Sequence, residues 1–230
     1  MYRPISAALL ALGIICVAGN TAAAVDIMAR TVPSKPSAVM VGTNSNDPAP
    51  AIYDAPPPPA HSKIFSNFAK YSKGKFVCCF GFSLSGGATT HQWLAVPFKP
   101  ATNTTAKTIE VAISNISGTN AAVITLNSDA GGIPGTALAT FHVSTLPSFG
   151  ATGTCCTITT VTSASGVALT GGHTYWVVVM TDAASATFKG IWHANEINQI
   201  SSQSGAVSQS GTTWGTTVFK PGLAFGVFGP

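Results

Sequence analysis

The chain has 230 residues, of which 8% are charged and 46% are hydrophobic, and its formal net charge is +4. Soluble proteins carry about 25% charged residues, so charge is scarce here while the apolar content is ordinary. Coiled coils, charged helical bundles and disordered polyelectrolytes need abundant Glu, Lys or Arg, and the composition excludes them. A neutral, turn-rich β protein remains, and the length fits one large domain with appendages.

Residues 1–24 have the pattern of a secretory signal peptide. Arg3 supplies the positive start, residues 7–19 form a short apolar stretch, and Ala22-Ala23-Ala24 offers an A-x-A cleavage site. The alternative, a membrane anchor or a core helix, is disfavoured because a bilayer span needs about 20 apolar residues. We therefore expect an exported chain, extracellular or at the cell surface, with no membrane span after cleavage.

Residues 25–60 predict a proline-rich disordered linker. Eight of the fifteen prolines lie between Pro33 and Pro59, with few residues that could build a core. This composition favours an extended, polyproline-like spacer, and a ligand for a proline-binding partner is the alternative interpretation. The globular domain is then expected to span residues 61–230.

A basic and aromatic segment opens this domain, over residues 63–76. Such mixtures can bind nucleic-acid strands or acidic polymers, because stacking and charge act together. The simpler interpretation is a solvated segment that leads into the first strand, and we favour it. We expect no nucleic-acid partner.

Four cysteines follow the signal peptide, in two doublets, Cys78-Cys79 and Cys155-Cys156. An even number of cysteines in an exported chain predicts disulfides, and four cysteines allow three pairings. In the chain-entropy model a bridge such as Cys79 to Cys155 closes a loop of about 77 residues and contributes roughly 4 kcal/mol, whereas a vicinal ring closes almost no loop. We therefore predict at least one bridge between the doublets. A metal site or a redox pair is the weaker alternative because its usual Cys-x-x-Cys spacing is missing, so no metal or cofactor is expected.

Hydrophobic periodicity in the domain is mostly two. Residues 109–114 alternate between isoleucine or valine and Glu110, Ala112 and Ser114, which predicts a strand with one buried and one solvated face. Ser165-Gly166 and similar pairs are typical of turns. Further strands are expected at residues 93–98, 121–126, 138–143, 156–161, 175–181, 188–193 and 223–228. The pattern predicts an all-β fold, a single antiparallel β-sandwich or jelly roll, and the lack of crossover helices excludes a parallel α/β fold.

Several short sequence motifs follow one another in a specific order along the domain. They are residues 127–135 (NSDAGGIPG), 153–156 (GTCC) and 166–179 (GVALTGGHTYWVVV), then Trp192 with Asn195, Trp214, and residues 224–229 (AFGVFG). In this order they resemble the bacterial choice-of-anchor R domain, and the resemblance covers most of residues 76–229. It implies an exported, β-sandwich-like module of bacterial surface proteins that differ in how they are anchored. It implies no catalytic residues.

The carboxylates of the domain are too few to predict a hydrolase. Glycosidases need two acids that face each other across a cleft, and Asp182 and Glu196 are the one couple that could serve. Neither a metal-binding H-E-x-x-H nor a nucleophile G-x-S-x-G motif occurs. A Ser-His-Asp triad is assembled in space and leaves no sequence pattern to search for. We therefore expect a protein that is not an enzyme.

Tryptophan and amide side chains are the candidates for a binding role. Sugar-binding sandwiches use exposed aromatic rings with amide partners, and Trp192, Asn195 and Trp214 are the candidate ligand-binding residues for an extracellular glycan or matrix polymer. The competing interpretation is that the tryptophans fill the core, since Trp is highly buried on average. The sequence thus predicts a structural, adhesion or matrix-contact role. Carbohydrate binding is the alternative, and glycan hydrolysis a more distant one.

Overall fold

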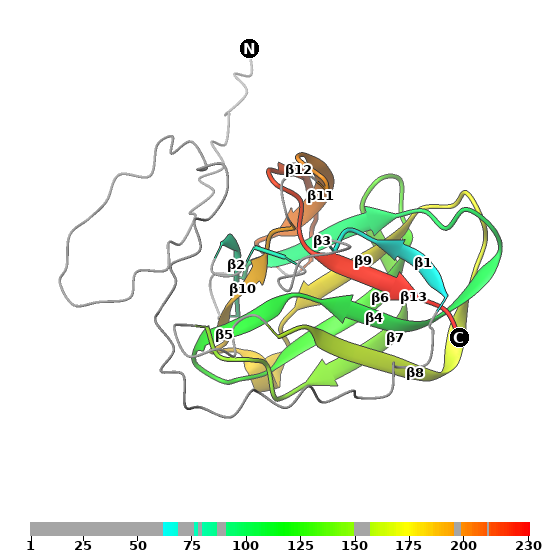
Figure 1. Cartoon of the computed structure of the whole chain (residues 1–230). Coiled ribbons are helices and arrows are strands. Elements are labelled where there is room, and N and C mark those ends of the chain that lie inside the picture. Colours follow the sequence, from blue (N-terminus) through cyan, green and yellow to red (C-terminus); the bar gives the residue numbers. More distant parts are fainter. Residues whose placement is uncertain are drawn as a thin grey trace, which may run out of the picture. The chain divides into compact units, whose positions relative to one another are not determined.

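The computed structural model describes residues 62–68, 76–77, 80–86, 91–149, 157–195, 199–210 and 212–230. Within these ranges the chain forms thirteen strands and one short 3-10 helix, and every strand pairing is antiparallel (Figure 1). The all-β expectation is therefore confirmed. The predicted signal peptide, the predicted linker and both cysteine doublets lie outside the described residues.

A six-stranded sheet is the largest of the three sheets, with the strand order β12-β11-β3-β9-β6-β7. Its strands are β3 (Trp93–Phe98), β6 (Ala122–Asp129), β7 (Pro134–Val143), β9 (Tyr175–Met180), β11 (Gln203–Ser208) and β12 (Gly215–Phe219). The central strands β3 and β9 are almost completely buried. Strands buried on both faces are nearly continuous in apolar residues, which explains the valine run of β9.

Two smaller sheets complete the fold. The four-stranded sheet has the order β1-β13-β4-β8 and contains β1 (Lys63–Ser66), β4 (Thr104–Val111), β8 (Thr159–Leu169) and β13 (Phe225–Phe228). The three-stranded sheet has the order β2-β10-β5 and contains β2 (Gly81–Ser85), β5 (Ile113–Ser117) and β10 (Lys189–His193). The 3-10 helix η1 (Ala183–Ser185) connects β9 to β10.

The smaller sheets join end to end at Ala112, which separates β4 from β5. The backbone N–H of His193 donates to the carbonyl of Ala112, and the N–H of Ala112 donates to the carbonyl of Ala224. The N–H of Ala224 in turn donates to the carbonyl of His193. Buried backbone groups need hydrogen-bond partners, and this ring of hydrogen bonds supplies them at the point where the chain leaves one sheet and enters the next.

The main core lies between the six-stranded sheet and the four-stranded sheet, in a sandwich. In Figure 1 the ribbons of β13 and β4 cross those of β9 and β6, and one hydrophobic cluster unites the facing side chains. Phe225 of β13 is at its centre, because its ring lies 4.8 Å from that of Phe65 and 6.4 Å from that of Phe98. Burial of such large rings is the main source of stability in a sandwich.

The structure corrects three sequence expectations about elements. The segment that begins at Lys63 is not only a solvated lead-in, because residues 63–66 pair with β13 as an edge strand. Ser165-Gly166 is not a turn: Gly166, at φ +74°, lies inside β8 beside the register shift opposite β4. Ser114 does not face solvent but is completely buried, because its face of β5 is covered.

Candidate functional site

A cleft opens at one end of the six-stranded sheet, where β3 and β6 end and where β9 and β11 begin. Its volume is about 320 Å³. Pro97 and Trp176 are paired across β3 and β9, and Trp176 packs in a cluster separate from the main core, so the cleft borders the outer face of the sheet. The lining residues are Pro97, Phe98, Lys99, Asp129, Gly132, Thr174, Trp176 and Ser204.

Strand alternation explains why Trp176 faces this cleft while its neighbour does not. Successive residues of a strand point to opposite faces, so Tyr175 joins the main core and Trp176 joins the outer-face cluster. Ala95, Val178 and Ala206 complete that cluster, and all three are small or branched side chains beneath the larger rings.

Asp129 is held in one orientation by three hydrogen bonds. The indole Nε1 of Trp176 donates to Oδ1 at 2.7 Å, and the backbone N–H of Gly132 donates to Oδ2 at 3.1 Å and to Oδ1 at 3.3 Å. Gly131 and Gly132 have φ values of +73° and +91°, which glycine adopts without strain, and this turn aims the N–H at the carboxylate. The hydrogen bond from Trp176 is the largest cause that holds the pKa of Asp129 below its usual range, and the charge of Lys99 acts in the same direction.

The cleft therefore combines a fixed carboxylate, an ammonium group and two hydroxyls with apolar walls. Lys99 donates hydrogen bonds, Asp129 accepts them, and the hydroxyls of Thr174 and Ser204 can do both. Ligand sites commonly pair apolar walls with a few placed polar groups, and this cleft is at the lower end of their usual volumes, about 300 to 1,000 Å³. Its chemistry suits recognition of a small polar group.

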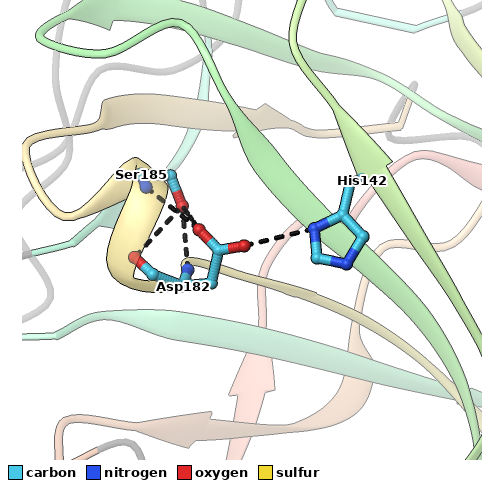
Figure 2. Close-up of polar contacts among 3 residues, drawn as sticks. All are labelled: His142, Asp182 and Ser185. Atoms are coloured by element: carbon cyan, nitrogen blue, oxygen red, sulfur yellow. Dashed lines mark hydrogen bonds and ion pairs between the residues drawn. The ribbon is translucent and has the colours of Figure 1, made fainter.

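A second cluster contains the exposed His142, Asp182 and the buried Ser185, in an order that does not activate serine. Figure 2 shows Asp182 between its two partners. Its Oδ1 accepts from the hydroxyl of Ser185 at 2.9 Å and from the N–H of Ser185 at 3.0 Å, and its Oδ2 lies 3.1 Å from Nδ1 of His142. A catalytic triad needs histidine between serine and the acid, so that it can take the serine proton.

The physical role of the second cluster is to start η1. Asp182 is the N-cap, and Ser185 completes a capping box by donating its hydroxyl and N–H to the carboxylate while accepting from the N–H of Asp182. The hydrogen bond from the hydroxyl of Ser185 is the largest cause that lowers the pKa of Asp182. Glu196, its expected partner in a glycosidase pair, lies outside the described residues.

A third pair, Ser114 and His193, is hidden in the interior. Oγ of Ser114 lies 2.8 Å from Nε2 of His193, and both residues are 0% exposed. The rings of Phe76 and Phe149 lie 5.2 Å and 6.2 Å from the imidazole. Among the described residues Nδ1 of His193 has no hydrogen-bond partner, and burial lowers the pKa of His193 to about 4. A pair with this burial packs the core and contacts no substrate.

Two of the three candidate ligand-binding residues prove to be buried. Trp192 and Asn195 are 0% exposed, so in this structure neither side chain is open to a ligand. The reason is their place in the fold: β10 is the middle strand of its sheet, and Trp192 packs edge-on against Phe225 while its Nε1 donates to the carbonyl of Ala224 at 2.9 Å. Trp214 is half-buried and packs against the outer-face cluster.

The residues that line the cleft carried little signal in the sequence. In the sequence Asp129 belongs to the segment NSDAGGIPG, and its bond to Trp176 joins residues that are 47 positions apart. Lys99 follows the last residue of β3, and Ser204 is a residue of β11. The glycine pair after Asp129 was the one hint, because glycines that permit positive φ often shape a binding loop.

Comparisons with protein-family models, with curated proteins and with solved structures find no match for this chain. In the part of the chain that the structure describes, no group of three histidine, cysteine or acidic side chains is placed to hold a metal ion. The single helix in the described residues has three residues, and it is too short to cross a membrane.

Proposed function

We propose that this chain is an exported, non-enzymatic β-sandwich module that works at or outside the bacterial cell surface, in adhesion or matrix contact. The pattern of residues 1–24, the proline-rich residues 25–60 and the resemblance to choice-of-anchor R domains support export to a surface. The observation that carries a binding role is the cleft at Lys99, Asp129 and Trp176.

The state of Asp129 favours binding over acid catalysis at this cleft. A carboxyl group that acts as a general acid near neutral pH needs a raised pKa, as in glycosidases. The pKa of Asp129 is lowered instead, chiefly by the hydrogen bond from Trp176, so the group stays ionised and accepts hydrogen bonds. A fixed acceptor beside an ammonium group recognises a ligand without transferring a proton to it.

Carbohydrate binding is the second candidate function, and the same cleft favours it. Of the three residues first considered for that role, only the half-buried Trp214 keeps access to a ligand. Glycan hydrolysis is the competing function, and substitution of Asp182 tests it.

The test uses the exported chain, purified under oxidising conditions and labelled. It is incubated with intact bacterial cells and with immobilised extracellular polymers, and both retention and polymer length are measured. We expect retention with no change in polymer length, and a heat-unfolded sample serves as the control. Release of shortened polymer that Asp182→Asn abolishes would replace the proposal with a hydrolase. Equal retention of native and unfolded protein would refute a specific adhesion role.

A further inference from the structure

We infer that the cleft at Lys99, Asp129 and Trp176 is a subsite for one ring of a neutral polysaccharide. The inference rests on the proposed binding function and deepens it by naming the ligand class and the residues. It replaces the buried Trp192 and Asn195 as the place where a sugar would bind.

The charges of the cleft select a neutral ligand. Lys99 and Asp129 are close enough that the lysine charge helps to lower the pKa of the carboxyl. An anionic ligand attracted by Lys99 is therefore repelled by Asp129, and a cationic ligand attracted by Asp129 is repelled by Lys99. A neutral polyol avoids both penalties, because one hydroxyl donates to the carboxylate while a neighbouring hydroxyl accepts from the ammonium group.

The carboxylate has capacity left for such a hydroxyl. An ionised carboxylate offers about four lone-pair sites, and Trp176 and Gly132 supply the three contacts that fix it. Asp129 is also exposed, so a ligand can reach it without a structural change. Since these bonds hold the group before binding, little ordering entropy remains to be lost when a sugar arrives.

The walls of the cleft suit the C–H faces of a sugar ring. Pro97 and Trp176 are paired side by side across β3 and β9, and Thr174 and Ser204 add hydroxyls at the rim. Trp176 is only 3% exposed, so it offers a wall and a fixed indole edge, not a wide stacking platform. The fit is to a single ring held by polar groups.

The ligand is expected to continue beyond the cleft. Trp176 belongs both to the cleft lining and to the outer-face cluster, against which the half-buried Trp214 and Met180 pack. An oligosaccharide that leaves the cleft along this face gains contact with aromatic surface. Affinity should therefore rise from a monosaccharide to a hexasaccharide.

The experiment measures binding of the exported chain to cellohexaose, maltohexaose, xylohexaose and chitohexaose by calorimetry, with heparin as the charged comparison, at low and high salt. Three variants probe the cleft: Lys99→Ala removes the ammonium group, Asp129→Asn removes the negative charge but keeps an acceptor, and Ser204→Tyr fills the space. Their matched controls are Lys220→Ala, another exposed lysine, and Thr160→Tyr, an exposed strand position on β8. Circular dichroism verifies that every variant folds.

We expect at least one neutral hexasaccharide to bind with little salt dependence. Each cleft variant should weaken it by about tenfold or more, the loss of roughly one good polar contact, while both controls stay within about twofold. Binding that the cleft variants leave unchanged would overturn the site. Binding of heparin alone, suppressed by salt, would overturn the ligand class. Retention on cells without binding to any hexasaccharide would refute this inference and leave the proposed function standing, whereas loss of both would refute the two together.

Discussion

Trp192 and His193 are consecutive residues of β10, and both are completely buried, on opposite faces of the strand. Trp192 contacts the main core, where its ring meets Phe225 and its indole N–H donates to Ala224. His193 contacts a separate apolar environment that contains Phe76. One short strand thus places a buried side chain on each of its faces. Trp192 contributes to stability at any pH, whereas the contribution of His193 depends on pH.

Replacement of Trp192 by alanine is expected to lower the free energy of unfolding by about 3 to 5 kcal/mol, because it opens a large cavity and removes one of the two hydrogen bonds that the carbonyl of Ala224 accepts. Trp214→Ala, at a half-buried ring, should cost clearly less. Urea unfolding followed by circular dichroism measures both values. Similar losses of stability for the two variants, or a small loss for Trp192→Ala, would contradict the conclusion that Trp192 is much more buried than Trp214.

His193 should make the domain less stable in mild acid. Its pKa is about 4 in the folded protein, lowered by burial, against 6.5 in the unfolded chain. Above pH 6.5 the imidazole is neutral in both states, so it adds no pH dependence. As the pH falls from 6.5 to 4 only the unfolded chain takes up the proton, and the free energy of unfolding decreases by about 3 kcal/mol in total.

Unfolding free energies measured from pH 8 to pH 4 test this expectation. His193→Gln should flatten the decrease between pH 6.5 and 4, because the buried imidazole that stays neutral in the folded protein is then absent. The lowered pKa values of Asp129 and Asp182 act in a different window, since they add stability that is lost only as the pH falls below about 4. A decrease that persists unchanged in His193→Gln would assign the acid sensitivity elsewhere.

At the scale of elements, Asn67 fastens the edge strand β1 to the chain that enters β13. Its Nδ2 donates to the carbonyl of Leu223 at 2.6 Å, and its Oδ1 accepts from the N–H of Phe225 at 2.8 Å. Gln203 supports the same stretch, because its Oε1 accepts from the N–H of Leu223 at 2.9 Å. Two side chains from distant elements therefore satisfy backbone groups at the entry to β13.

Asn67→Ala should lower the free energy of unfolding by about 2 to 4 kcal/mol, since it leaves a buried carbonyl and a buried N–H without their partner. Asn115→Ala is the matched control, because that amide donates a 3.2 Å bond to Ser117 at the surface, and its cost should be about 0.5 kcal/mol or less. Thermal unfolding of both variants measures the difference. Equal costs would show that β1 does not depend on Asn67.

Strands were predictable from sequence where the apolar alternation is strong. The expectation for residues 93–98 matches β3, and those for 175–181 and 188–193 differ from β9 and β10 by one residue each. Strands β11 and β12 were missed because their sequences, QSGAVS and GTTVF, are rich in small polar residues and show little apolar alternation. β11 pairs with β3, and β12 pairs with β11, and this pairing is a tertiary effect that local sequence does not carry.

The candidate site was less predictable than the strands, for a geometric reason. Trp176 and Asp129 meet because β9 and β6 are neighbours in the six-stranded sheet. The order of strands in a sheet depends on the whole chain, so the sequence of a single strand does not predict it. The same limit explains why the burial of Trp192 could not be predicted. An aromatic residue near amide side chains is typical of a sugar site and of a core alike, and only the position of β10 in the middle of its sheet separates the two.

At the scale of the whole molecule, the described residues that flank the cysteine doublets come together. Phe76, two positions before Cys78, packs in one hydrophobic cluster with Ile158, two positions after Cys156. Ala112 and Ala224 belong to the same cluster, at the junction of the two smaller sheets. Segments about 80 positions apart in the sequence thus share one neighbourhood, and a covalent bond between them would close a long loop.

We therefore expect the protein, purified under oxidising conditions, to contain at least one disulfide between the doublets, and its reduction to lower the free energy of unfolding by roughly 4 kcal/mol in the chain-entropy model. Peptide mapping without reduction should recover a peptide pair that joins residues 78–79 to residues 155–156, and thermal unfolding with and without reductant should show the loss. A variant with serine at all four positions is the control: reductant should not change its unfolding temperature, which should match that of the reduced parent. Vicinal rings or free thiols in the map would contradict the prediction, because neither constrains the unfolded chain over that loop.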